Sequence, residues 1–272
     1  VSDDVSLDTA SDAVFLDDPS PVPGDEGWHI VHEALPEALL SVWGRGSEDL
    51  WAVGADKGVG PIVLHGTSAG WTRVVTGTTG DLWWVFGPDD TQVVMVGQGG
   101  TVLRYAPDSD TLTSLDTGTD ATLFGVWGAP ERLWAVGGHL PPADGPPVLL
   151  RIEGEDVTQV PLPPGLPDGV IFFKVWGTSP GDVWVIGEQG VQLHFDGVSW
   201  TYHPVADSPR LVTLHGDGGG LRVAVGGAGN AVLLKQAEQT LLCAERFEEC
   251  FAEAGLPDGV FQYLHMNHPN IQ

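Results

Sequence analysis

The chain has 272 residues, with 37 Asp or Glu against 11 Lys or Arg and a formal net charge of −26. It lacks the clustered cations that neutralise phosphates, which argues against a nucleic-acid partner. Hydrophobic residues make up 42%, beside 38 Gly, 21 Pro and 11 Trp, which is too apolar for a disordered acidic polymer. No apolar run reaches the roughly 18 residues of a spanning helix. The sequence therefore predicts a folded, soluble protein without a membrane span.

Residues 1–26 are rich in Asp, Ser and Pro and have no sustained apolar period. Such a segment buries too little surface to offset its ordering entropy, so we expect a disordered acidic tether. It resembles the spacer that follows the lipid-anchored cysteine of bacterial lipoproteins. That resemblance implies an extracellular, periplasmic or cell-surface location and a lipid anchor upstream.

The rest of the chain repeats one pattern, an apolar run ending in Trp-Gly, a polar turn, and a second run ending in WAVG or a variant of it. The Trp position recurs at intervals of about 40 to 50 residues, the length of one four-stranded propeller blade. Its occupants are Trp43, Phe86, Trp127, Trp176 and His215.

Two shorter alternating runs follow in each unit, separated by Gly-, Asp- and Pro-rich turns. Four short strands per unit predict an all-β protein, a β-propeller of four-stranded antiparallel blades. The propeller domain is placed at 27–272. Its five complete blades lie near 39–77, 82–117, 122–161, 171–206 and 210–244.

A split sixth blade is predicted from the two ends of that domain. Residues 27–33 look like an outermost strand, and 260–267 look like an innermost strand because AGLPDGVFQYLHMN repeats PGLPDGVIFFKVWG. Two middle strands have no sequence, so we expect a C-terminal truncation, with a larger ring as the alternative. Cys243 and Cys250 lie close together in one segment, and with export they predict a local disulfide.

On the segment VWGTSPGDVWVIGEQGVQLHFDGVSW (175–200) and its weaker copies, residues 27–267 resemble the bacterial sialidase-repeat, or Asp-box-like, propeller superfamily. The resemblance is closer to the exported repeat propellers of myxobacteria and to the photosystem II assembly factor type. Asp196, Gly197, Ser199 and Trp200 give a shorter spacing than the usual Asp-box. The arginines do not recur where sialidases clamp a carboxylate, so sialidase activity is not expected.

Several motifs that could carry chemistry have simpler interpretations. GTSAG (66–70) matches the nucleophile elbow, but strands flank it where that motif needs a helix, which favours a turn. Asp89, Asp90, Asp108, Asp110 and the acidic residues before WAVG favour turns, with calcium left open. A copper or zinc cluster of His265, Met266 and His268 with His29 and His32 is disfavoured by strand alternation, so no such metal site and no cofactor are predicted.

Nine of the 11 Trp residues fall at repeated positions, which favours packing over carbohydrate stacking. Trp83 and Trp84 lie outside that pattern. Strand alternation predicts that the side chains of such an adjacent pair point to opposite faces.

The longest insertions, 137–147, 161–169 and 244–259, belong to the two loop classes that emerge on one face of a propeller. Binding loops gather on such a rim, so we expect a non-enzymatic scaffold, monomeric, that recognises a protein or glycan there. The alternative is a polysaccharide hydrolase or lyase acting at the channel mouth. The candidate ligand-binding residues are His139, Asp144, Asp168, Asp258, His215, Tyr263 and His265.

Overall fold

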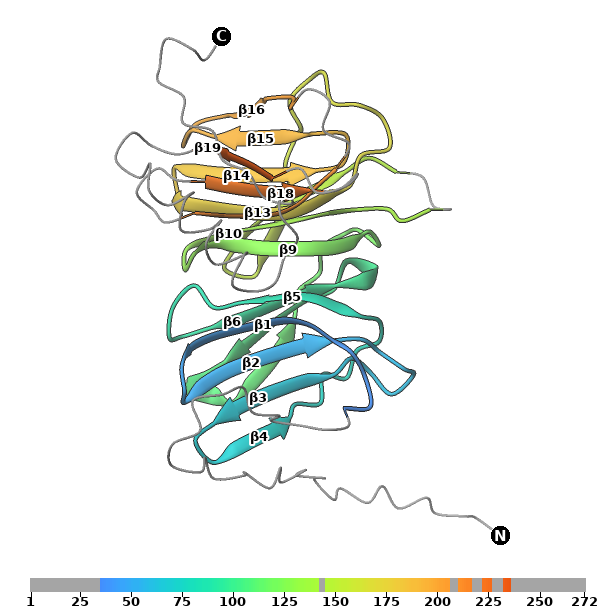
Figure 1. Ribbon diagram of the computed structural model, residues 1–272. Coiled ribbons are helices and arrows are strands. Elements are labelled where there is room, and N and C mark those ends of the chain that lie inside the picture. Colours follow the sequence, from blue (N-terminus) through green and yellow to red (C-terminus); the bar gives the residue numbers. More distant parts are fainter. Residues whose placement is uncertain (1–34, 142–144, 206–209, 217–221, 227–231, 236–272) are drawn as a thin grey trace, which may run out of the picture.

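The computed structural model describes residues 35–141, 145–205, 210–216, 222–226 and 232–235 (Figure 1). These residues form 19 strands and two short 3-10 turns, η1 (Gln98–Gly100) and η2 (Pro107–Ser109). The predicted tether, both parts of the split sixth blade, and Cys243 and Cys250 lie outside the described residues.

The strands form consecutive antiparallel sheets in which neighbours in sequence are neighbours in space. Blade one contains β1 (Leu39–Gly46), β2 (Asp49–Gly54), β3 (Val63–Thr67) and β4 (Gly70–Arg73). Blade two contains β5 (Leu82–Phe86), β6 (Val93–Gly97), β7 (Val102–Ala106) and β8 (Thr111–Ser114). Blade three contains β9 (Thr122–Ala129), β10 (Arg132–Gly138), β11 (Val148–Glu153) and β12 (Asp156–Gln159).

The last two blades continue the series. Blade four contains β13 (Phe172–Ser179), β14 (Asp182–Gly187), β15 (Gln192–Phe195) and β16 (Trp200–Tyr202). The described part of blade five contains β17 (Leu211–Gly216), β18 (Arg222–Gly226) and β19 (Val232–Lys235). Its predicted fourth strand falls outside the described residues.

Each hydrophobic cluster lies between two consecutive blades, so a blade buries both of its faces. One position of the inner strand illustrates this, since Val85, Val126 and Val175 are each almost fully buried. The equivalent Val42 of β1 is 68% exposed. In Figure 1 the outermost strands β4 and β16 lie at opposite ends of the molecule, and the inner strands lie between them.

The repeated Trp-Gly pair is explained by contact between blades. A Cβ atom on Gly87 would overlap the indole of Trp43, and one on Gly177 would lie 2.6 Å from the indole of Trp127. Each Trp therefore packs on the glycine of the next inner strand, where any side chain would occupy the same space. Packing at this density leaves no room for an added methyl group.

Gly177→Ala is expected to lower the free energy of unfolding by about 1 to 3 kcal/mol, the usual cost of overpacking. The matched control is Gly181→Ala in the same blade, where the nearest atom to the new Cβ lies 3.6 Å away. Urea unfolding of both variants measures the difference. Equal stability of the two variants would contradict the packing role of Gly177.

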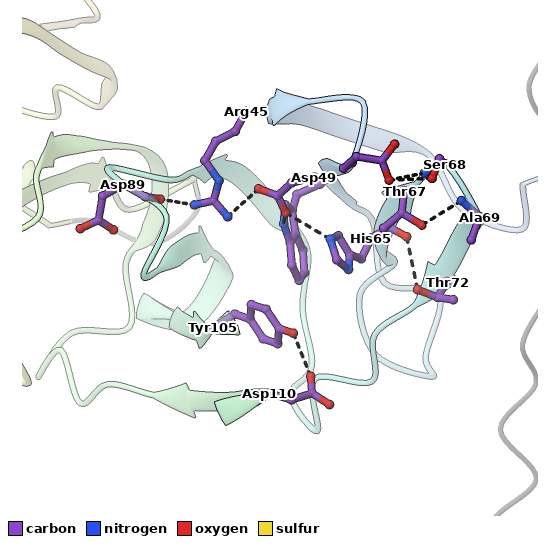
Figure 2. A network of polar contacts seen from close by, with 12 residues as sticks. Arg45, Asp49, His65, Thr67, Ser68, Ala69, Thr72, Asp89, Tyr105 and Asp110 are labelled. Carbon is purple, nitrogen blue, oxygen red and sulfur yellow. Dashed lines mark hydrogen bonds and ion pairs between the residues drawn. The ribbon is translucent and has the colours of Figure 1, made fainter. Parts of the chain in front are cut away.

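The acidic residue before WAVG fixes the second strand through its side chain. In blade one Asp49 Oδ1 accepts a hydrogen bond from Trp51 Nε1 (2.8 Å) and lies 3.1 Å from His65 Nε2. Figure 2 shows Asp49 between Arg45 and His65. Blade four repeats the unit with Asp182, Trp184 and His194, at 2.9 and 2.8 Å.

Candidate functional site

The inner strands carry an aromatic tier at their C-terminal ends. The rings at the Trp position form one continuous series around the axis, with consecutive centroids 6.3, 6.4, 6.4 and 5.7 Å apart. His215 ends this series by packing on Trp176. This tier is structural, and it accounts for the regular spacing of tryptophan in the sequence.

A second tier lies at the N-terminal ends of the same strands, three residues before the Trp position. In each of the five inner strands the pairing with the second strand skips one residue there, which makes a β-bulge. A bulge changes the direction of side chains in a way that regular alternation does not allow. The skipped residues are Leu40, Trp83, Phe124, Phe173 and Val212.

All five skipped residues line a single cavity of about 540 Å³. Trp83, Phe124 and Phe173 form a chain of edge-to-face rings, with centroids 5.2 and 5.5 Å apart. Trp84 lines the same cavity. The predicted opposite orientation of Trp83 and Trp84 was therefore wrong, because the bulge at Trp83 breaks the alternation.

The loops around this cavity belong to the two predicted rim classes. His139 and Gly145 come from the loop between β10 and β11, and Glu188 comes from the one after β14. Gly169 and Arg210 come from the loops that lead into β13 and β17. The cavity volume lies in the range of small-molecule sites, roughly 300 to 1,000 Å³.

Lys174 is the unusual residue of this cavity. Its side chain is 7% exposed, and its Nζ lies 2.8 Å from the centroid of the Trp84 ring. No carboxylate of a described residue pairs with it. Burial disfavours the charged amine and lowers the pKa of Lys174 to about 7. At neutral pH this amine is therefore close to half protonated.

The reach of Lys174 depends on a glycine. Lys174 belongs to blade four and Trp84 to blade two, and the equivalent residue of the intervening blade three is Gly125. A Cβ atom on Gly125 would lie 3.4 Å from the Cα of Lys174 and 3.2 Å from a backbone oxygen of Phe173. The missing side chain leaves the space across which the lysine contacts Trp84.

The remaining charged groups of the described lining are paired. Arg210 Nη2 donates to Glu188 Oε1 at 2.5 Å, and the guanidinium lies 5.4 Å from the Phe173 ring. His139 Nε2 lies 3.2 Å from Asp120 Oδ1. Trp83 Nε1 and His139 Nδ1 are buried without a hydrogen-bond partner among the described residues.

The predicted site residues have different positions. His139 lines the cavity, and the Asp168 carbonyl, beside the cavity residue Gly169, accepts from Gln189 Nε2 at 3.2 Å. His215 lies in the other aromatic tier, away from the rim. The predicted residues outside the described part of the chain are Asp144, Asp258, Tyr263 and His265.

Lys174, Phe124 and the pair Glu188 and Arg210 were not predicted from the sequence. The repeat does contain a pattern that indicates Lys174, because the position two residues before the repeated Trp varies while the residues on either side of it stay apolar. Its occupants are Ser41, Trp84, Gly125, Lys174 and Thr213. A lysine there stands out in a chain with three lysines.

The acidic turn residues bind their own backbone. Asp89 accepts from the Thr91 amide at 3.0 Å, and Asp196 accepts from the amides of Val198 and Ser199 at 2.9 and 2.8 Å. These amides lower the pKa of Asp196. Within the described ranges no cluster of three or more His, Cys, Asp or Glu could hold a metal ion.

Within the described residues, the side chains relevant to the two enzyme interpretations are paired with other groups. Ser68 of GTSAG lies in the turn between β3 and β4, where its hydroxyl donates to Glu48 Oε2 at 2.6 Å. Glycoside hydrolysis commonly uses two carboxyl groups. Among the described cavity residues Glu188 is the sole carboxylate, and Arg210 pairs with it.

No helix in the described ranges is long and apolar enough to cross a membrane.

Comparison with solved structures finds propellers. The chain is similar to the extracellular domains of two hybrid two-component systems of B. thetaiotaomicron, BT4673 and BT3049, with TM-scores of 0.56 and 0.55 and identities of 16% and 12%. The matches cover 86% and 75% of this chain but only 28% and 29% of those chains. YCF48 from Cyanidioschyzon merolae matches with a TM-score of 0.55 and 17% identity, over 78% of this chain and 70% of that one.

Comparison of sequences finds a different, short similarity. Residues 223–272 match the model of the aldehyde dehydrogenase family. Malonate-semialdehyde dehydrogenase 2 of Bacillus mycoides (strain KBAB4) is 52% identical over 40 residues, which is 15% of this chain and 8% of that protein. The matched stretch includes the residues assigned to the inner strand of the sixth blade, so that blade remains a prediction.

The family match covers too little of the chain to assign a family. The structural likenesses, which cover most of it, agree with the antiparallel sheets and with the order of the blades. The chain has a β-propeller fold.

Proposed function

We propose that this protein is an exported, non-enzymatic binding scaffold that recognises a protein or glycan at one loop rim. One observation carries the proposal. The inner strands are alike at the structural tier, yet where the rim loops meet them they carry unlike side chains that line one cavity. Packing alone would favour repetition there as well, whereas recognition needs distinct groups at fixed places.

Export and an extracellular, periplasmic or cell-surface location belong to this proposal. They are supported by the resemblance of residues 1–26 to a lipoprotein spacer and by the likeness to two domains described as extracellular. The proposed form is a monomer, and the upstream lipid anchor and the local disulfide between Cys243 and Cys250 remain parts of the proposal.

The test is a screen of the full chain against a glycan array and a peptide library, followed by affinity measurements on each ligand found. Phe124→Ala removes the central ring of the cavity wall, and we expect it to weaken binding at least about tenfold, as loss of a buried aromatic contact does at other interfaces. Trp71→Ala removes an aromatic ring from the outermost strand β4, which contributes none of the described residues that line the cavity, and serves as the matched control.

Ligands whose affinity is unchanged by Phe124→Ala would contradict the rim assignment. Cleavage of a bound glycan during the screen would instead favour the hydrolase or lyase alternative.

A further inference from the structure

The cavity combines two features that together define a ligand. Its walls are the rings of Trp83, Phe124 and Phe173, and its inner end holds the amine of Lys174. Rings with exposed edges and faces favour a flat aromatic partner, because aromatic pairs gain energy in offset and edge-to-face arrangements. The volume of about 540 Å³ suits a molecule of two or three fused or linked rings.

Among the described residues the amine has no counter-charge of the kind that buried cations normally have. A buried charge is usually paired, because removing it from water is costly. The contact with Trp84 is a cation–π interaction worth up to about 2 kcal/mol, too little to replace hydration and an ion pair. A carboxylate brought by a ligand would supply the missing partner.

The other charged groups near Lys174 do not meet this need. Glu188 is held by Arg210, and His139 faces Asp120. The positions equivalent to Lys174 in the inner strands β5, β9 and β17 are Trp84, Gly125 and Thr213. None of these residues titrates in the neutral range. Lys174 is therefore the one lysine or arginine of the described cavity lining that has no carboxylate partner among the described residues.

We infer that this cavity takes a small aromatic carboxylate, whose rings lie against Trp83, Phe124 and Phe173 and whose carboxylate pairs with the amine of Lys174. The inference rests on the proposed function, and it specifies the chemical group that a ligand would present to Lys174. Binding involves no covalent step. It converts the neutral fraction of the lysine to the ammonium form, so the complex takes up protons from the solvent.

The test uses 2-naphthoate and its neutral isostere 2-naphthamide as probes of the full chain, measured by isothermal titration calorimetry. We expect naphthoate to bind at least about tenfold more tightly than naphthamide, as a charge-assisted contact allows. The pKa of Lys174 in the ligand-free protein is about 7, so naphthoate binding at pH 7 should take up about 0.5 proton. This uptake makes the measured binding enthalpy depend on the ionisation enthalpy of the buffer. The affinity should fall about 30-fold between pH 6 and pH 8.5.

Two variants separate the lysine from its surroundings. Lys174→Met keeps the length of the side chain without the amine, and it should abolish both the preference for naphthoate and the proton uptake. Lys174→Arg keeps a permanent charge, so it should retain the preference but lose the proton uptake and the pH dependence. Circular dichroism of both variants confirms that they are folded.

Equal affinity of the two probes for the unmodified protein would overturn the inference, as would failure of both to bind at millimolar concentration. A preference that survives Lys174→Met but is lost in Arg210→Met would overturn it in favour of the arginine. None of these results bears on the macromolecular screen, in which Phe124→Ala and Trp71→Ala test the rim itself. The proposed function can therefore fail or stand independently.

Discussion

Trp51→Ala is expected to lower the free energy of unfolding by about 3 to 5 kcal/mol, the usual cost of removing a large buried aromatic side chain. Trp51 is 0% exposed and belongs to the cluster between blades one and two. Its indole stacks on His65 with centroids 4.3 Å apart, lies 4.7 Å from the Tyr105 ring, and donates to Asp49. The substitution therefore leaves a cavity and removes one of the donors to Asp49.

Urea unfolding followed by circular dichroism measures this loss. Trp51→Phe keeps much of the volume but not the indole N–H, so it should cost about 1.5 to 3 kcal/mol, the range for a hydrogen bond to a charged group. Trp71→Ala is the matched control, because the same substitution is made at a half-buried residue of an outermost strand. A loss at Trp51 no larger than that at Trp71 would show that the Asp-Trp-His unit does not stabilise the blade.

Lys174→Met is expected to raise the free energy of unfolding at pH 7, by on the order of 4 kcal/mol. The pKa of Lys174 is lowered from 10.5 to about 7 by burial, and each tenfold change in an ionisation constant is worth about 1.4 kcal/mol. Because the folded-state pKa is the lower one, the unfolded chain binds more protons between pH 7 and pH 10.5. The stability of the unmodified protein should therefore rise with pH across this window.

The difference between Lys174→Met and the unmodified protein should shrink to about 1 kcal/mol at pH 10, because this pH is close to the ordinary lysine pKa of 10.5 and ionisation in the unfolded chain then contributes little. The matched control is Lys57→Met at an exposed lysine, where the difference should be small and nearly constant with pH. The measurement is urea unfolding at pH 7, 8.5 and 10. A destabilised Lys174→Met variant at pH 7 would mean that the amine has a partner in solution.

The two expected results concern buried polar groups that have opposite effects on stability. The indole of Trp51 has its acceptor within the blade, so burial and hydrogen bonding both stabilise the fold. The amine of Lys174 has no such partner among the described residues and lowers stability. Residues that destabilise a fold are characteristic of sites where recognition or activity sets the requirement.

The β-propeller fold followed from the sequence alone. A repeat of Trp-Gly and WAVG segments predicts blades because each blade must bury both faces against similar neighbours, so the same residue types recur at the same places. The strands Phe172–Ser179 and Asp182–Gly187 lie within the segment 171–206. His139 and Gly169 are on two of the insertions expected at the rim, and they line the cavity, while recognition at this rim stays a prediction.

The content of the site depended on tertiary structure. Strand alternation placed Trp83 and Trp84 on opposite faces, and only the bulge in the pairing with β6 brings both to the cavity. Contact between Lys174 and Trp84 depends on two blades that are not consecutive and on the space left by Gly125. The repeated residues show what neighbouring blades share. The candidate site at the axis is instead formed by residues that differ between blades. These residues come close together only because the chain curves around that axis.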